Sequence, residues 1–249
     1  MDEARTPAGE LPNGGVFPST HWSVVLSAAA GGAPHAEDAL ARLCKAYWYP
    51  LYVFLRRRGC SPEESEDLTQ EFFSRLVHKE FLAGLTQEGG KFRSFLLTAL
   101  TRFVANEWSR ERAQKRGGGK AVISIDADAE TRYGRELADH VTPQTLFERR
   151  WALTVLDRVL ARLRQEYSAA GKQELFSRLE GCLPGAQSPV AYAEAGAALD
   201  IKEATLRMAA LRLRRRYGQL LRAEIAATVS SPTEIDEEIR YLIRVVGHG

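Results

Sequence analysis

Residues 61–77, SPEESEDLTQEFFSRLV, decide the fold because they specify a whole amphipathic helix from its first turn to its last. Ser61 supplies a capping hydroxyl, Pro62 fits the first helical position, and Glu64 completes an S-x-x-E capping box. At about 100° per residue, the apolar side chains share one side of this helix. They are Leu68, Phe72, Phe73, Leu76 and Val77. The stretch therefore predicts a helix that packs one face against a core.

The opposite face of the same helix is acidic. Acids and no base lie between Ser61 and Phe73, namely Glu63, Glu64, Glu66, Asp67 and Glu71. An exposed acidic face favours a basic protein partner and repels nucleic acid. A solvated surface helix without any partner would give the same pattern, so the rest of the chain must decide.

Composition and charge limit the class of protein. The chain has 249 residues, 45% of them hydrophobic, and a net charge of +2, which fits one large or two small globular domains. Residues 102–120 and 207–222 are basic, whereas residues 126–148 between them are acidic. Two basic segments with an acidic one between them predict a polyanion contacted at two places.

Cysteine usage and hydropathy indicate the compartment. Cys44, Cys60 and Cys182 are widely spaced and form no C-x-x-C pair, so neither a disulfide framework nor a zinc site is predicted. The apolar run 24–30 is short and lacks the basic flank of a signal peptide, and no stretch reaches membrane-spanning length. We expect a cytoplasmic protein without a membrane partner.

The periodicity predicts an all-α fold of two helical domains joined by a flexible acidic linker. Apolar residues recur at helical spacing over 36–58, with a kink or break at Pro50, and again over 91–116 and from Thr142 through Tyr167. The predicted organisation is a disordered tail (1–18), a helical bundle (19–116), a linker (117–141), a second helical domain (142–229) and an acidic extension (230–249). The triple glycine 117–119 marks the boundary.

The second predicted domain contains a helix-turn-helix pattern. A helix ending at Leu199 meets a long basic helix that runs to about Ala227, and Asp200 with Glu203 is expected to cap the second one. Its buried positions are predicted to be Ile201, Leu206, Ala210 and Leu213. Its outward positions are Lys202, Glu203, Thr205, Arg207, Met208, Leu211 and Arg212, with Arg214, Arg215 and Arg216 as further phosphate contacts. A solvated arginine-rich face with no DNA partner is the alternative.

The helix over 91–116 combines aromatic rings with cations, which suits unpaired bases. Phe92, Phe95 and Phe103 have core spacing and are assigned to packing. The DNA candidates are Arg93, Arg102, Asn106, Trp108, Arg110 and Arg112. No H-E-x-x-H, P-loop, G-x-S-x-G or dinucleotide motif is present, so we expect no enzymatic activity, no cofactor and no metal.

Four segments together resemble a bacterial RNA polymerase sigma factor of the sigma-70 superfamily. Asp67, Leu68, Gln70, Glu71, Phe73 and Leu76 match its D-L-x-Q-E-x-F-x-x-L signature. The segments FRSFLL (92–97), RAQKRGGG (112–119) and ERRWALT (148–154) resemble a subgroup of the extracytoplasmic-function type, which has only regions two and four. The resemblance covers about residues 22–243.

The resemblance implies a transcription-initiation factor that directs core polymerase to promoters. Asp67, Gln70, Glu71 and Phe73 would bind the polymerase clamp helices. Region two, with Arg93, Arg102, Asn106, Trp108, Arg110 and Arg112, would melt the minus-ten element. Region four would sit on the polymerase flap and recognise the minus-thirty-five element through Lys202, Glu203, Thr205, Arg207, Met208, Leu211 and Arg212. The acidic linker would thread through the polymerase.

Two further expectations accompany this interpretation. An anti-sigma protein or another regulator would control such a factor, and the acidic helix over 234–246 is hypothesised to cover a basic surface of the chain itself. The rival interpretation is a helix-turn-helix repressor or activator that acts without polymerase. It explains the second domain and leaves the acidic face of 61–77 unexplained.

Overall fold

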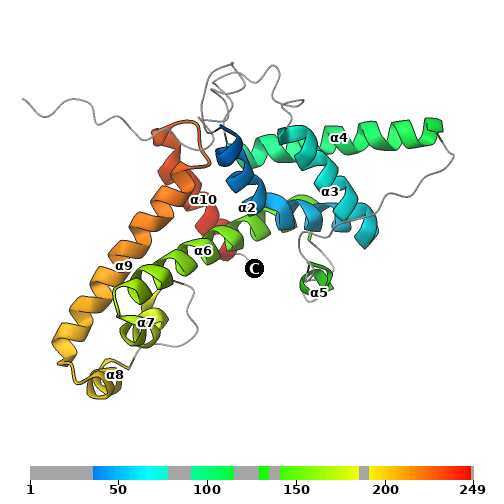
Figure 1. The fold of residues 1–249 in the computed structure, drawn as a ribbon. Helices are drawn as coiled ribbons and strands as arrows, with labels where there is room; N and C mark the ends of the chain where they lie inside the picture. The colour runs from blue at the N-terminus through cyan, green and yellow to red at the C-terminus, as the bar shows by residue number, and fades with distance from the viewer. Residues whose placement is uncertain (1–35, 78–90, 115–128, 135–140, 185–190, 248–249) are drawn as a thin grey trace, which may run out of the picture.

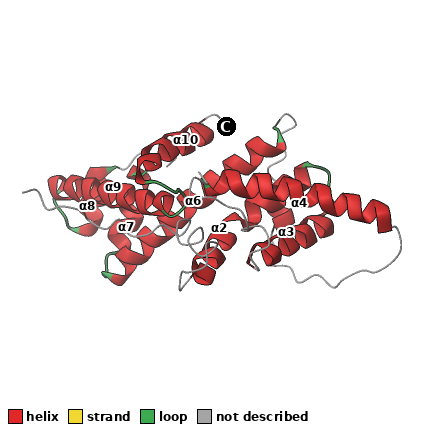
Figure 2. Cartoon of the chain, turned by 90° about the horizontal axis from the view of Figure 1, so that it is seen from above, coloured by secondary structure: helices red, strands yellow, loops and turns green. Residues whose placement is uncertain are grey.

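The computed structural model describes residues 36–77, 91–114, 129–134, 141–184 and 191–247. Within these ranges the regular structure is entirely helical, which confirms the all-α prediction (Figures 1 and 2). The elements are α2 (Ala36–Arg57), α3 (Pro62–Val77), α4 (Phe92–Gln114), α5 (Ala129–Gly134), α6 (Pro143–Ala169), α7 (Gln173–Leu179), η1 (Glu180–Cys182), α8 (Tyr192–Leu199), α9 (Glu203–Ala226), η2 (Pro232–Glu234) and α10 (Ile235–Gly247). The predicted N-terminal tail (1–18) and the first part of the predicted bundle (19–35) lie outside the described residues.

Helix α3 begins as its sequence predicts. The Ser61 amide donates to Glu64 Oε2 at 2.8 Å, and the Glu64 amide donates to Ser61 Oγ at 3.2 Å. This reciprocal pair is a capping box, which satisfies two backbone donors that the first turn leaves without helical partners. Phe72 and Leu76 are fully buried where α3 packs against α2 and α4.

Helix α2 is the central element of the N-terminal half. An unbroken run of its side chains, residues 46–55, is buried, and each of them is apolar or aromatic. The chain stays helical through Pro50, and Figure 1 shows α2 changing direction along its length, as expected where proline removes a backbone donor. Gly59 ends the helix with a φ of 93°, a conformation that glycine adopts without a steric penalty.

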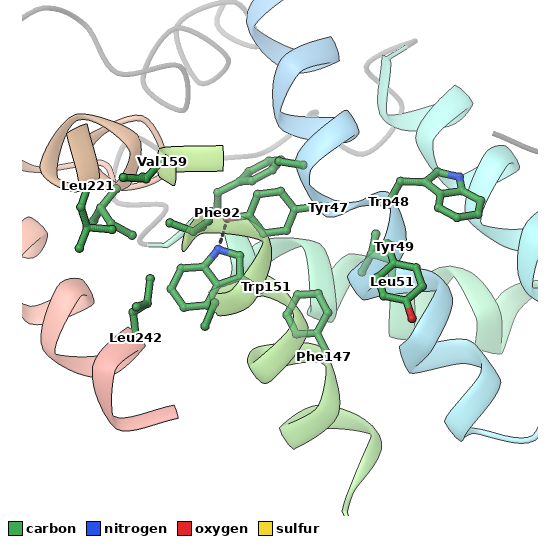
Figure 3. Close-up of a cluster of buried hydrophobic side chains, with 14 of the residues drawn as sticks. Tyr47, Trp48, Tyr49, Leu51, Phe92, Phe147, Trp151, Val159, Leu221 and Leu242 are labelled. Atoms are coloured by element: carbon green, nitrogen blue, oxygen red, sulfur yellow. Dashed lines mark hydrogen bonds between the residues drawn. The ribbon is translucent and has the colours of Figure 1, made fainter. Parts of the chain in front are cut away.

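The N- and C-terminal halves share one continuous core. Trp151 on α6 donates its indole N–H to the Tyr47 hydroxyl on α2 at 2.8 Å, and Tyr47 packs edge-on against Phe92 of α4 (Figure 3). Burial raises the pKa of Tyr47, and the indole hydrogen bond offsets only part of that rise. The predicted arrangement of two separate helical domains is therefore not confirmed.

The predicted extended linker is wrong for residues 129–134. These residues form α5, which packs against α2 and buries Ala129 and Tyr133. The Arg132 guanidinium lies 3.6 Å from the ring centroid of Tyr49, and Arg56 lies 4.9 Å from that of Tyr133. These cation–π contacts hold the short helix on α2. Residues 117–128 and 135–140 of the predicted linker lie outside the described residues.

Helices α6, α9 and α10 form the C-terminal half. Thr142, where the predicted helix starts, caps α6 by accepting the Thr145 amide at 3.1 Å. Glu166 of α6 receives both arms of Arg216 of α9 at 2.7 Å, and α10 packs across α6 and α9. In the part of the chain that the structure describes, no helix is both long enough and apolar enough to cross a membrane.

Candidate functional site

The acidic face of α3 points into solvent. Four of its carboxylates are exposed, those of Glu63, Glu64, Asp67 and Glu71, while Glu66 and Gln70 are partly buried at its edge. The opposite side is packed, with Ser65 and Thr69 buried beside the aromatic residues. We refer to Glu63, Glu64, Asp67, Gln70 and Glu71 as the acidic face.

Phe73 does not belong to this surface, although it was predicted to contact a partner. Only 7% of it is exposed, and its ring lies 5.6 Å from that of Phe72 inside the core. Phe73 therefore belongs to the core beneath the acidic face.

A chain of ion pairs connects the acidic face to α4. Arg75 bonds Glu71 at 2.9 Å and Glu107 of α4 at 2.9 Å, and Glu107 also bonds Arg110 at 2.9 Å. The Arg75 guanidinium lies 5.0 Å from the ring centroid of Phe103. Neither Arg75 nor Glu107 was predicted to belong to this surface. The i,i+4 spacing of Glu71 and Arg75 could have indicated the first link, whereas the second depends on how α3 and α4 pack.

The C-terminal half of α4 presents most of the predicted minus-ten residues. Arg102, Asn106 and Arg110 are exposed. Trp108 is half-buried, with the Arg58 guanidinium 5.4 Å from its ring centroid, so one face of the indole is already covered. Arg112 lies within α4, but its side chain is outside the described part of the molecule.

Arg93 is separated from this group because the structure buries it. Only 8% of Arg93 is exposed, and its guanidinium bonds the Glu238 carboxylate of α10 at 2.5 and 3.3 Å. Burial opposes the charge on Arg93, yet the Glu238 carboxylate outweighs it, so the pKa of Arg93 lies above its ordinary value. The expectation that Arg93 is an exposed DNA contact is wrong for this conformation.

The helix-turn-helix is present, with a different turn from the one predicted. Asp200 is the C-cap of α8, at φ 53° and ψ 42°, and Lys202 is the N-cap of α9 without a side-chain capping bond. The predicted Asp200–Glu203 capping box is therefore wrong. Asp and Asn tolerate the left-handed region better than most residues, which lets Asp200 occupy a position where glycine is common.

Gly196 makes this turn possible. Its carbonyl accepts the Ile201 amide at 2.9 Å, and a Cβ at position 196 would lie 2.7 Å from the Ile201 carbonyl oxygen. We expect Gly196→Ala to lower the free energy of unfolding by about 1–3 kcal/mol in urea titrations, through overpacking. Gly218→Ala in α9 is the matched control, since no described atom lies within 4 Å of its Cβ, and it should stabilise by about 0.5–1 kcal/mol. Equal stabilisation by both variants would contradict the close approach of position 196 to the Ile201 carbonyl in this turn.

The exposed face of α9 matches its prediction. The outward positions are all exposed, namely Lys202, Glu203, Thr205, Arg207, Met208, Leu211 and Arg212. Leu206, Ala210 and Leu213 are buried as predicted, and Ile201 is partly buried. Met208 and Leu211 are more than half exposed on this face.

The arginines of α9 differ in what they contact. Arg214 donates to the Cys182 carbonyl at 2.8 Å, and Arg216 is held by Glu166, so both stabilise the fold. Arg207 pairs with Glu203 at 2.6 Å and lies 4.7 Å from the ring centroid of Tyr192. Among the described residues, no ion pair or hydrogen bond engages Arg212 or Arg215.

These surfaces lie far apart on the molecule. The C-terminal end of α4 and the α8–α9 turn occupy opposite ends in both views (Figures 1 and 2). Helix α3 packs against α4 and α2, in the half of the molecule away from the α8–α9 turn. Among the described residues, no group of three or more His, Cys, Asp or Glu side chains could hold a metal ion.

Comparisons of this chain with protein-family models, with curated proteins and with solved structures found no match.

Proposed function

We propose that this chain is a sigma-type initiation factor that binds core RNA polymerase through the acidic face of α3 and holds promoter DNA with α4 and α9. The observation that carries the proposal is the acidic face itself. It is exposed on one side of a tightly packed helix, and Arg75 connects it to the basic flank of α4. A surface of this charge suits a basic protein and repels DNA, so a protein partner accounts for it better than contact with DNA does.

The two cationic surfaces support a division of labour on DNA. The flank of α4, with Arg102, Asn106 and Arg110, suits the backbone of an opened strand. The exposed face of α9 follows a tight turn and presents polar, apolar and cationic side chains together, as an element in the major groove requires. Their positions at opposite ends of the molecule suit two separate promoter elements.

The rival function is a helix-turn-helix repressor or activator that never binds polymerase. The exposed face of α9 supports this function equally well. The repressor or activator function gives no role to the acidic face. The two proposals therefore differ in whether this face binds core polymerase.

The proposal is tested by pull-down and promoter transcription with bacterial core RNA polymerase. We expect the unmodified chain to bind core, and Asp67→Lys or a combined Gln70→Ala, Glu71→Lys change to weaken binding by about 100-fold or more, because like charges facing each other cost several kcal/mol. Glu174→Lys reverses an exposed charge on α7 and is the matched control, with an expected effect below about threefold. Tight duplex binding without any core binding would favour the rival function.

A further inference from the structure

Helix α10 and the segment before it close over the start of α4. Ile235 and Leu242 of α10 are buried where the helix packs on α6 and α9. The Thr228 carbonyl, between α9 and α10, accepts the Phe92 amide of α4 at 3.0 Å. A first-turn amide has no partner within its own helix, so this bond shows that the C-terminal segment also completes α4.

An ion cluster forms the centre of this contact. Besides the two bonds from Arg93, the Glu238 carboxylate receives Lys91 Nζ at 3.1 Å, and only 1% of Glu238 is exposed. The guanidinium also lies 4.0 Å from the ring centroid of Tyr241 and 5.2 Å from that of Trp151. We call Lys91, Arg93 and Glu238 the α4–α10 cluster.

The chemistry of the cluster matches that of a phosphate site. A carboxylate and a phosphate present their oxygens to a guanidinium fork in the same two-pronged way, and a lysine adds a point charge to either. The first turn of α10 is wholly acidic after its first residue, with Asp236, Glu237 and Glu238 in succession. An acidic helix therefore holds two cations with the same kind of oxygen ligands that a phosphate group presents.

The cost of burying charges favours an α4–α10 cluster that is either fully paired or fully open to water. Removing both charges from water costs several kcal/mol, and the bidentate pairing returns much of that cost only while the geometry is exact. Glu148 lies 3.6 Å from Arg93 and can keep partial compensation when Glu238 leaves. Loss of Glu238 alone would leave the buried Arg93 charge poorly compensated and be strongly destabilising, whereas a competing anion that takes its place keeps Arg93 paired.

We propose that α10 is a built-in competitor of DNA, holding Lys91 and Arg93 until a phosphodiester backbone displaces Glu238. The proposal rests on the proposed function, because it assigns a regulatory element to the same DNA-binding surface. In the closed form the chain contacts DNA only through residues that are already exposed on α4 and α9. In the open form two further cations become available.

The test compares Glu238→Gln with Glu237→Gln in the full chain. Both remove one charge from neighbouring positions of α10, but Glu237 is 65% exposed and touches the cluster only through Lys91 at 3.6 Å. We expect Glu238→Gln to bind forked promoter DNA about tenfold more tightly in fluorescence anisotropy. The plot of log affinity against log salt should steepen by about 1–2, as expected for two additional phosphate contacts. Glu237→Gln should change neither quantity appreciably.

Two further measurements identify the cause of any gain. Hydrogen exchange at the Phe92 amide should accelerate in Glu238→Gln, because that amide reports on the contact with Thr228. Adding Arg93→Gln to Glu238→Gln should abolish the gain in affinity. DNA binding by the unmodified chain with no gain in Glu238→Gln would overturn this proposal alone, whereas no DNA binding by either protein would overturn the proposed function as well.

Discussion

Replacing Trp151 with alanine should lower the free energy of unfolding by about 3–5 kcal/mol, the usual range for deleting a fully buried large aromatic side chain. Trp151 is 1% exposed and lies where α2, α4, α6 and α10 meet. Its loss leaves a cavity and removes the donor to the buried Tyr47 hydroxyl. Urea titration followed by far-ultraviolet circular dichroism measures the change.

Two variants separate the cavity from the hydrogen bond. Trp151→Phe keeps a buried aromatic ring and should lower the free energy of unfolding less than Trp151→Ala does. About 1–3 kcal/mol of its effect is assigned to the Tyr47 hydroxyl left without its donor. Tyr47→Phe completes a double-mutant cycle for the pair. If Trp151→Ala weakened α6 to α10 while α2 to α4 kept their own unchanged transition, the shared core would be contradicted.

Replacing Arg212 and Arg215 together with glutamine should weaken binding to duplex DNA by about 10- to 100-fold at moderate salt. Both side chains are exposed on α9, three residues apart and so on one side of the helix. Each phosphate contact contributes about 0.9 to the slope of log affinity against log salt, so the slope should fall by about 2. Anisotropy titrations over a salt series measure both effects.

The matched control replaces Arg214 and Arg216 with glutamine. These two arginines carry the same charge as Arg212 and Arg215 and differ from them in what they contact. Arg214 donates to Cys182 and Arg216 is clamped by Glu166, so their loss should lower thermal stability and leave the salt slope nearly unchanged. An equal fall of the slope in both double variants would mean that α9 binds DNA only through its total charge.

Local features of the fold were predictable because they depend on neighbours in the chain. The capping box at Ser61, the Thr142 cap and the buried and exposed positions of α9 all follow from spacings of three and four residues. The same reasoning predicted the acidic face and the terminal acidic helix α10. The proposed function depends on these local features together with the family resemblance.

Features that depend on distant partners were not predictable. Arg93 and Phe73 were assigned to binding because neither the spacing nor the charge of α3 and α4 shows what covers them. Glu238 lies 145 residues from Arg93, and its buried partner cannot be found by periodicity. At the turn, Asp200 fits a capping pattern and a left-handed C-cap equally well, and only the backbone decides between them.

The hydrogen bond between Tyr47 and Trp151 also has a consequence for how the protein is made. Its partners are 104 residues apart, so at about 5–20 residues per second a ribosome adds the indole some 5–20 seconds after the phenol. Throughout that interval the aromatic run of α2 lacks its partner helix and remains accessible to other nascent chains. We expect translation stalled between these two positions to yield a fragment that binds chaperones or aggregates, because the first half of the protein completes its core only when the second half arrives.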